Sequence, residues 1–221
     1  MSGRGRFITL EGGEGAGKSV QSARLAERLR AAGVETVRTR EPGGSPHAEA
    51  LREAILSGFA RGFGSAGEAI LFAAARIDHL DQTILPALAR GAWVISDRFA
   101  DSTRVYQGAA GKLPEGFVAR LEAVSVGAHG PDLTLILDLP PEAGLARATR
   151  RRGGEEADRF EAEGLAFHET LRRAFLAIAE KEPERCVVVD AAGSEDAVEA
   201  AIWAAVETRL HPERSGNGAA P

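Results

Sequence analysis

The chain has 221 residues, 44% of them hydrophobic and 27% charged, with a formal net charge of −5. This composition supports a sizeable core and excludes an intrinsically disordered chain, and the acidic balance argues against a general nucleic-acid-binding protein. No apolar run approaches the roughly 20 residues of a membrane span, and none near the N-terminus is long enough for a signal peptide. We therefore expect a cytoplasmic protein without membrane or nucleic-acid partners.

Apolar runs of strand length recur along the chain, separated by longer segments of helical periodicity. Turn-forming residues stand just before three of these runs: Gly33, Gly91 and Pro131. The last run begins at Cys186, the single cysteine, which we interpret as a core residue because it opens an apolar strand. The expected strands are 7–10, 34–39, 93–96, 133–139 and 186–190.

Helical patterns fill the intervals between these strands. The first stops at Gly33, and the second is long, with a kink expected at Pro86. A third begins with prolines, and the fourth begins with a serine cap followed by acidic residues. The expected helices are 20–33, 65–91, 140–152 and 194–210.

The alternation of strands and helices decides the expected fold class. It predicts an α/β protein with a parallel five-stranded sheet flanked by helices on both faces. Because no repeat or linker interrupts 5–210, we expect this range to form one domain. Residues 211–221 are expected to form a flexible, solvated tail.

A glycine-rich stretch, GGEGAGKS, joins the first predicted strand to the first predicted helix and matches the P-loop pattern G-x-x-x-x-G-K-[ST]. Glycines let backbone N–H groups converge on phosphate oxygens, and the helix N-terminus adds partial positive charge. Lys18 can reach the β- and γ-phosphates, and the Ser19 hydroxyl can bind Mg²⁺. The predicted nucleoside triphosphate site, of P-loop NTPase type, comprises Gly12, Gly13, Glu14, Gly15, Ala16, Gly17, Lys18 and Ser19.

A P-loop also occurs in GTPases, which recognise their base with an Asn-Lys-x-Asp motif. The only asparagine of the chain is Asn217, in the expected tail, so the GTPase interpretation fails. Two acidic residues, Asp97 and Asp138, follow or end apolar strands, as the metal-binding carboxylate of a P-loop enzyme should. We choose Asp97 because Arg98 follows it, and such a pair can serve metal and phosphate together. For Asp138 a structural role is expected.

Arginines are abundant where phosphate oxygens would need them. Arg40 ends the second predicted strand, and a further cluster surrounds Gly153 and Gly154. We interpret this cluster, at about 148–160, as a mobile lid whose closure would exclude water and supply positive charge. Its arginines are Arg147, Arg150, Arg151, Arg152 and Arg159.

Phe72 and Arg76 lie four residues apart in LFAAAR and should share one helix face. A flat group could stack on Phe72 while Arg76 reads its edge, and a pyrimidine base would suit this arrangement. Further hydrogen bonds to that base could come from Ser102, Thr103 and Gln107.

Together these motifs resemble the thymidylate kinases of bacterial type. The matching stretches are EGGEGAGKS, TREPGG, LFAAAR, DRFADSTRVYQG, PDLTLILD and DRFE, in the order of that family over nearly the whole chain. The resemblance implies ATP-dependent phosphorylation of dTMP to dTDP with Mg²⁺, supplying dTTP synthesis, and a homodimer. Val20 and Phe99 depart from residues that are common in the family, but the chemical groups of the motifs are kept.

The resemblance also implies roles for individual residues. Asp97 would organise Mg²⁺ and the acceptor, and Glu14 would face the 3′-hydroxyl of the deoxyribose. The other implied dTMP contacts are Phe72 for stacking, Arg76, Gln107 and Ser102 or Thr103 for the polar edge of thymine, and Arg40, Arg52 and Arg98 for the acceptor phosphate.

Members of this family differ in the origin of the catalytic arginine. Some carry it in the P-loop, at the place that Gly15 occupies here. This sequence therefore resembles the class that supplies the arginine from the lid, and we expect Arg151 and Arg159 to act there beside Lys18, Asp97 and Arg98.

Two alternatives remain at this stage. The chain could be a P-loop kinase for another acceptor, such as CMP, AMP, a deoxynucleoside or a non-nucleotide alcohol. It could also be a regulatory module that binds ATP without transferring phosphate, although the residues for transfer are present.

Overall fold

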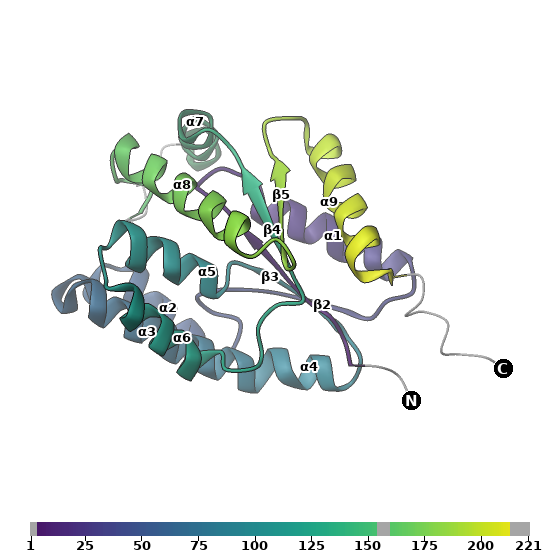
Figure 1. Ribbon diagram of the computed structural model, residues 1–221, viewed down its shortest axis with the longest axis horizontal. Helices are drawn as coiled ribbons and strands as arrows, with labels where there is room; N and C mark the ends of the chain where they lie inside the picture. Colours follow the sequence, from purple (N-terminus) through teal and green to yellow (C-terminus); the bar gives the residue numbers. More distant parts are fainter. Residues whose placement is uncertain (1–3, 154–159, 213–221) are drawn as a thin grey trace.

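Five parallel strands form one sheet in the order β2-β3-β1-β4-β5, in a computed structural model that describes residues 4–153 and 160–212. The predicted parallel five-stranded sheet of P-loop NTPase type is thereby confirmed. Helices cover both faces of the sheet (Figure 1). The strands are β1 (Phe7–Glu11), β2 (Thr36–Arg40), β3 (Trp93–Asp97), β4 (Leu133–Asp138) and β5 (Cys186–Asp190).

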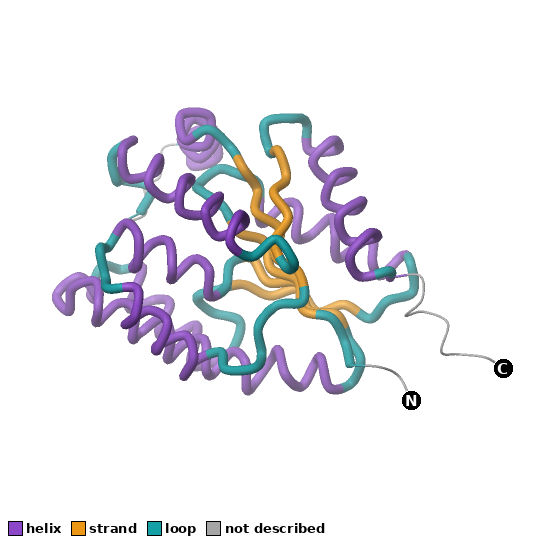
Figure 2. Tube along the Cα trace, in the orientation of Figure 1, coloured by secondary structure: helices purple, strands orange, loops and turns teal. Residues whose placement is uncertain are grey.

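Figure 2 shows helices surrounding the central sheet, and half of the described helical elements were expected from the sequence. The elements within the expected range 65–91 are interrupted by a π-helical turn directly before Leu85 and Pro86, where proline cannot donate the usual helical hydrogen bond. Six of the described helical elements lie outside the expected helices: α2, η1, α5, η3, α6 and α8. The elements are α1 (Lys18–Ala31), α2 (Pro46–Leu56), η1 (Phe59–Phe63), α3 (Gly64–His79), η2 (Leu80–Ile84), α4 (Leu85–Ala89), α5 (Ala100–Thr103), η3 (Arg104–Ala110), α6 (Glu115–Ser125), α7 (Pro141–Arg152), α8 (Leu165–Lys181) and α9 (Glu195–Leu210).

The strands alternate between two apolar cores, as the two-residue period of a strand requires. Ile8 and Leu10 pack with α1 and α9 on one face. Phe7 packs on the other face with η2, α4 and Phe99. Both cores are fully enclosed at β1, because all five of its residues are buried. Burying side chains of this size stabilises the fold by about 1.5–3 kcal/mol each.

The register of the strands brings their carboxyl ends to a common edge. Leu10 of β1 lies opposite Asp97 of β3, and Glu11 lies opposite Ile136 of β4. The loop after β1 therefore emerges between the ends of its two neighbours, where ligands of open α/β sheets bind. Among the described helices, none is long and apolar enough to cross a membrane.

Candidate active site

The P-loop connects β1 to α1 and is shaped by left-handed glycines. Gly12, Gly15 and Gly17 have φ values of 136°, 68° and 90°. Lys18 lies across the loop, and its Nζ donates hydrogen bonds to the carbonyl oxygens of Gly12 at 3.0 Å and Gly13 at 2.7 Å. Burial, and then the nearby Arg98, lower the pKa of Lys18. An anion in the loop would favour the charged ammonium.

A cavity of about 300 Å³ opens beside the P-loop at the carboxyl edge of the sheet. It brings together residues from the P-loop, β2, α2, α3, the β3 end, η3 and α7. Of the predicted site residues, Gly12, Gly13 and Ala16 belong to the loop without lining this cavity, and Arg159 lies outside the described residues. The predicted residues that line it are Glu14, Gly15, Gly17, Lys18, Ser19, Arg40, Arg52, Phe72, Arg76, Asp97, Arg98, Ser102, Thr103, Gln107 and Arg151.

The two carboxylates weighed as metal ligands have different surroundings. Asp97 accepts a hydrogen bond from the Ser19 hydroxyl, which links the predicted metal ligands of β3 and α1. Asp138 is held by Arg172 of α8, with oxygen–nitrogen distances of 2.6 and 2.8 Å. The geometry thus favours Asp97 at the site and gives Asp138 a structural ion pair. Within the described ranges, no group of three or more His, Cys, Asp or Glu side chains could hold a metal by itself.

Arg98 occupies an unusual backbone position directly after β3. Its φ of 71° lies in the left-handed region, which costs a non-glycine residue of the order of 1–3 kcal/mol and must be held by its surroundings. The guanidinium pairs with Glu14 and donates to Ser102 Oγ at 3.2 Å. The Tyr106 hydroxyl also donates to Glu14, at 2.9 Å. Burial opposes ionisation of Glu14, but Arg98 and Lys18 outweigh it and lower its pKa to about 2.

The predicted base-reading residues line the cavity together. Arg76 reaches from α3 and donates through Nη2 to Thr103 Oγ1 at 3.0 Å and to the Phe99 carbonyl at 3.3 Å. Gln107 is buried in η3, and Phe72 lies one helical turn before Arg76 on α3. An aromatic ring, a guanidinium and an amide therefore line the same cavity.

The arginines of the expected lid do not act as one group in this structure. Arg151 lines the cavity and pairs with Glu161 at 3.0 Å. Arg147 instead donates to the carbonyl oxygens of Ala191 and Ala192, at 2.9 and 3.1 Å, in the loop after β5.

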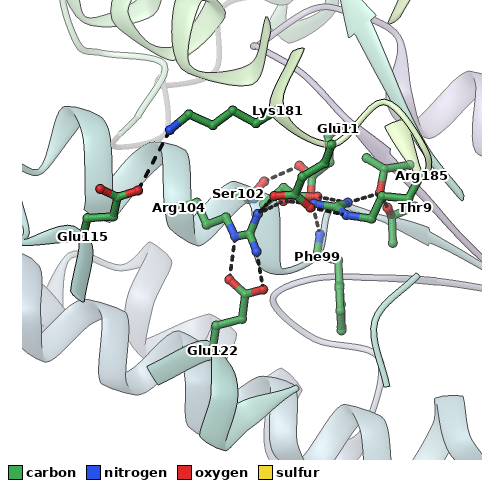
Figure 3. A network of polar contacts seen from close by, with 12 residues as sticks. Thr9, Glu11, Phe99, Ser102, Arg104, Glu115, Glu122, Lys181 and Arg185 are labelled. Carbon is green, nitrogen blue, oxygen red and sulfur yellow. Dashed lines mark hydrogen bonds and ion pairs between the residues drawn. The ribbon is translucent and has the colours of Figure 1, made fainter. Parts of the chain in front are cut away.

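Sequence reasoning gave no role to Glu11, the last residue of β1. This carboxylate is completely buried and accepts hydrogen bonds from Phe99 N at 2.8 Å, Ser102 N at 3.3 Å and Ser102 Oγ at 2.6 Å (Figure 3). It therefore ties the start of the P-loop to the segment that contains Arg98. Burial, and then Asp101, raise its pKa to about 7. The signal in the sequence was a carboxylate at the end of a fully apolar strand.

Figure 3 also shows the polar network behind Glu11. Arg185 donates to both oxygens of Asp101, at 2.7 and 2.8 Å, and to Thr134 Oγ1 at 2.7 Å. Thr134 in turn is hydrogen-bonded to Thr9 of β1 at 2.8 Å. The site loop after β3 is thus anchored to β1, β4 and the start of β5.

Gly15 leaves no room for a side chain in the P-loop. A Cβ added there would overlap the carbonyl oxygen of Gly144 in α7, and one added at Gly144 would overlap the Glu14 carbonyl. The P-loop and α7 therefore pack backbone against backbone. An arginine at position 15 is incompatible with this arrangement.

Replacing Gly15 with Ala should lower the free energy of unfolding by about 2 kcal/mol or more, because the left-handed φ and the overlap with Gly144 both oppose a Cβ. Thermal unfolding of the nucleotide-free protein measures this, and the expected decrease in Tm is about 4–8 °C. Gly13→Ala is the matched control, since a Cβ at Gly13 would meet nothing within 4 Å. Equal Tm values for the two variants would contradict the packing argument.

Replacing Glu11 with Gln should change how stability depends on pH. The folded-state pKa of about 7 exceeds the ordinary 4.5, so the folded wild type binds more protons in this window and loses stability as pH rises through it. Glutamine keeps the shape of the side chain without its charge. The free energy of unfolding of the Glu11→Gln variant, relative to that of wild type, should therefore increase between about pH 5 and about pH 8, by about 1.4 kcal/mol per pKa unit.

Urea unfolding at the two pH values measures this difference for Glu11→Gln. The exposed Glu35→Gln serves as the control, because Glu35 forms only a surface pair with Arg90. A difference from wild type that stays constant with pH would show that Glu11 is ionised throughout the range.

The chain is similar in sequence to proteins of one known family. Residues 10–202 match the sequence model of the thymidylate kinase family. A thymidylate kinase of Bradyrhizobium diazoefficiens is 54% identical over 211 residues, covering 96% of this chain and 92% of the relative. One of Nitrobacter winogradskyi is 56% identical over 208 residues, covering 94% and 90%.

A solved structure agrees with these sequences. The crystal structure of thymidylate kinase from Ehrlichia chaffeensis superposes with a TM-score of 0.74 at 30% identity, covering 92% of this chain and 99% of that one. The chain belongs to the thymidylate kinase family.

Proposed function

We propose that the cavity at the carboxyl edge of the sheet binds ATP and dTMP together and transfers the γ-phosphoryl group between them. The chain is a dTMP kinase that forms dTDP, as its family and its 54–56% identity to thymidylate kinases indicate. One observation carries the assignment of this site. The P-loop Lys18 and the base-reading pair Phe72 and Arg76 line the same cavity of about 300 Å³.

The transfer needs positioning and charge neutralisation more than proton transfer. The acceptor phosphate of dTMP is already an anionic nucleophile, so no strong general base is required. Lys18 would hold the β- and γ-phosphates, and Arg98, beside Ser102, would hold the acceptor. Because Lys18 is 7% exposed and the Arg98 side chain 18% exposed, their charges would act strongly on the transferring group.

The acceptor side carries further positive charge from β2 and α2. Arg52 donates to the Pro42 carbonyl at 2.6 Å, and Arg40 pairs with Glu49 at 3.1 Å. Burial, and then the like charge of Arg40, lower the pKa of Arg52. A dianionic phosphate between them would relieve this repulsion, which supports their proposed role in holding dTMP.

Ser19 and Asp97 fit a Mg²⁺ site. Their oxygens are in hydrogen-bond contact, and hydroxyl and carboxylate oxygens are ligands that Mg²⁺ accepts together with water and phosphate. When bound, Mg²⁺ neutralises phosphate charge. The two side chains would hold it between the P-loop and the end of β3.

We further propose that one domain, 5–210, carries a lid at about 148–160 and a tail at 211–221. Arg151 already lines the cavity and is the candidate for transition-state charge within the described residues. Arg159, the second candidate, lies outside them. A cytoplasmic location is part of the same proposal.

We also propose a homodimer formed through α3 and α6, which pack against each other. In the described residues, large apolar side chains are exposed on both helices: Ile70 is 52%, Ile77 40% and Val124 76% exposed. Ile70 and Ile77 are two helical turns apart and so form one stripe on α3. A second copy would cover this stripe.

Replacing Lys18 with Ala should lower kcat by about 10²–10³-fold while the domain stays folded, because the ammonium acts on the transferring phosphate. The measurement is ADP release from ATP and Mg²⁺ with dTMP, dUMP, CMP, AMP and shikimate as acceptors. Wild type should be fastest with dTMP. Lys181→Ala is the control, since Lys181 lies on the surface at the end of α8.

Each other outcome has a distinct meaning. Near-normal turnover by the Lys18 variant would refute the P-loop mechanism. Turnover only with another acceptor would refute the base-reading roles of Phe72 and Arg76. ATP binding without turnover on any acceptor would favour a regulatory module.

Replacing Ile77 with Asp should convert the proposed dimer to a monomer, because burying an unpaired carboxylate opposes association. Size-exclusion chromatography with light scattering gives the mass directly. Val188→Asp is the control, an exposed apolar residue on β5, remote from α3. A wild-type protein that is monomeric at micromolar concentration would refute the proposal.

A further inference from the structure

The motif TREPGG, residues 39–44, begins in the last two residues of β2, and the proposed function leaves part of it unexplained. Arg40 and Glu41 both line the cavity, but the side chains of Thr39 and Glu41 also contact residues of α3. Glu41 accepts a hydrogen bond from Arg76 Nε at 2.8 Å through one oxygen and contacts His79 Nδ1 at 3.1 Å through the other. The opposite ring nitrogen of His79 lies 2.7 Å from Thr39 Oγ1. Glu41, His79 and Thr39 thus form a relay that ends on Arg76.

This relay is enclosed. Glu41 is 7% exposed, Arg76 3% and His79 0%. A guanidinium removed from water to this extent needs a carboxylate partner, and here that partner is itself held by a second side chain.

Gly44 closes over the relay. Its φ is 86°, and a Cβ added there would overlap both His79 Nε2 and Thr39 Oγ1. Gly44, the second glycine of the motif, is therefore required, because the backbone passes against the imidazole of His79 at this position.

The relay fixes the orientation of Arg76. Nε is bound to Glu41, and Nη2 is bound to Thr103 Oγ1 and to the Phe99 carbonyl. Within the described part of the chain, Nη1 donates no hydrogen bond, and Arg76 lines the cavity. The guanidinium plane cannot rotate without breaking bonds on both sides, so its remaining donor is presented in one direction.

We propose that Glu41 and His79 are positioning residues that set base selectivity by locking the Arg76 guanidinium with a donor toward the base. This inference rests on the proposed function, in which Arg76 reads the polar edge of thymine. Thymine carries an acceptor oxygen at C4, whereas cytosine carries an amino donor there. A fixed N–H donor binds the first and opposes the second, but a guanidinium free to turn would discriminate less.

The test compares kcat and KM for dTMP and dCMP in wild type, Glu41→Gln, His79→Gln, Thr39→Val and Arg76→Ala. Glu41→Gln should reduce the dTMP-to-dCMP ratio of kcat/KM by about 10–100-fold, because an amide cannot hold the guanidinium as a carboxylate does. The change should fall on KM for dTMP, while KM for ATP stays unchanged. Thr39→Val, at the far end of the relay, should lower the ratio in the same direction by about 2–5-fold. Glu35→Gln is the control for a lost surface carboxylate.

The outcomes separate this inference from the proposed function. If Arg76→Ala loses the selectivity while the Glu41, His79 and Thr39 variants keep it, the relay has no positioning role. If Arg76→Ala keeps it, the base-reading role of Arg76 is refuted and the relay proposal with it. Should Glu41→Gln fail to fold, the ratios of the His79 and Thr39 variants decide. A merely structural role would lower stability without moving the ratio.

Discussion

The parallel register of β1 with its neighbours is the constraint on which the site depends. It places Leu10 opposite Asp97, so the chain leaves β1 as the P-loop directly beside the end of β3. Ser19, at the start of α1, can then reach Asp97. The P-loop and the pair Asp97 and Arg98 lie side by side although they are about 80 residues apart in sequence, because parallel strands bring their carboxyl ends to one edge.

Compensation between buried charges keeps this arrangement in place. Glu11 and Glu14 flank the first glycines of the P-loop, and Lys18 and Arg98 lie against them. The two carboxylates respond in opposite ways: Glu14, paired with Arg98, has a pKa of about 2, whereas burial raises that of Glu11 to about 7. Glu14 thus balances the charges of Lys18 and Arg98, and Glu11 binds the backbone of the segment that carries Arg98. These contacts fix the positions of Lys18 and Arg98 within the folded protein.

The sequence predicted the sheet and the motif residues because both have local signals. Strand runs, glycine stops and the P-loop spacing each lie within about 20 residues of chain. Glu11, Glu41 and Tyr106 received no role because their partners lie far away in sequence: Glu41 meets Arg76 and His79 only when α3 packs beside β2. Local patterns predict elements and ligand chemistry, while long-range packing decides which carboxylate holds which arginine.

The contact between Gly15 and Gly144 limits where positive charge in the site can originate. The backbone of α7 fills the space where a P-loop side chain would stand, so positive charge for the transferring group cannot originate at position 15. In the proposed function this charge comes from the far end of α7, where Arg151 lines the cavity and pairs with Glu161. The acceptor side is different, because Arg76 and Arg98 are held in the core by carboxylates. Under the proposed function, rigid groups would recognise the acceptor and a separate element would complete the donor side. Water would then be excluded once both substrates are bound.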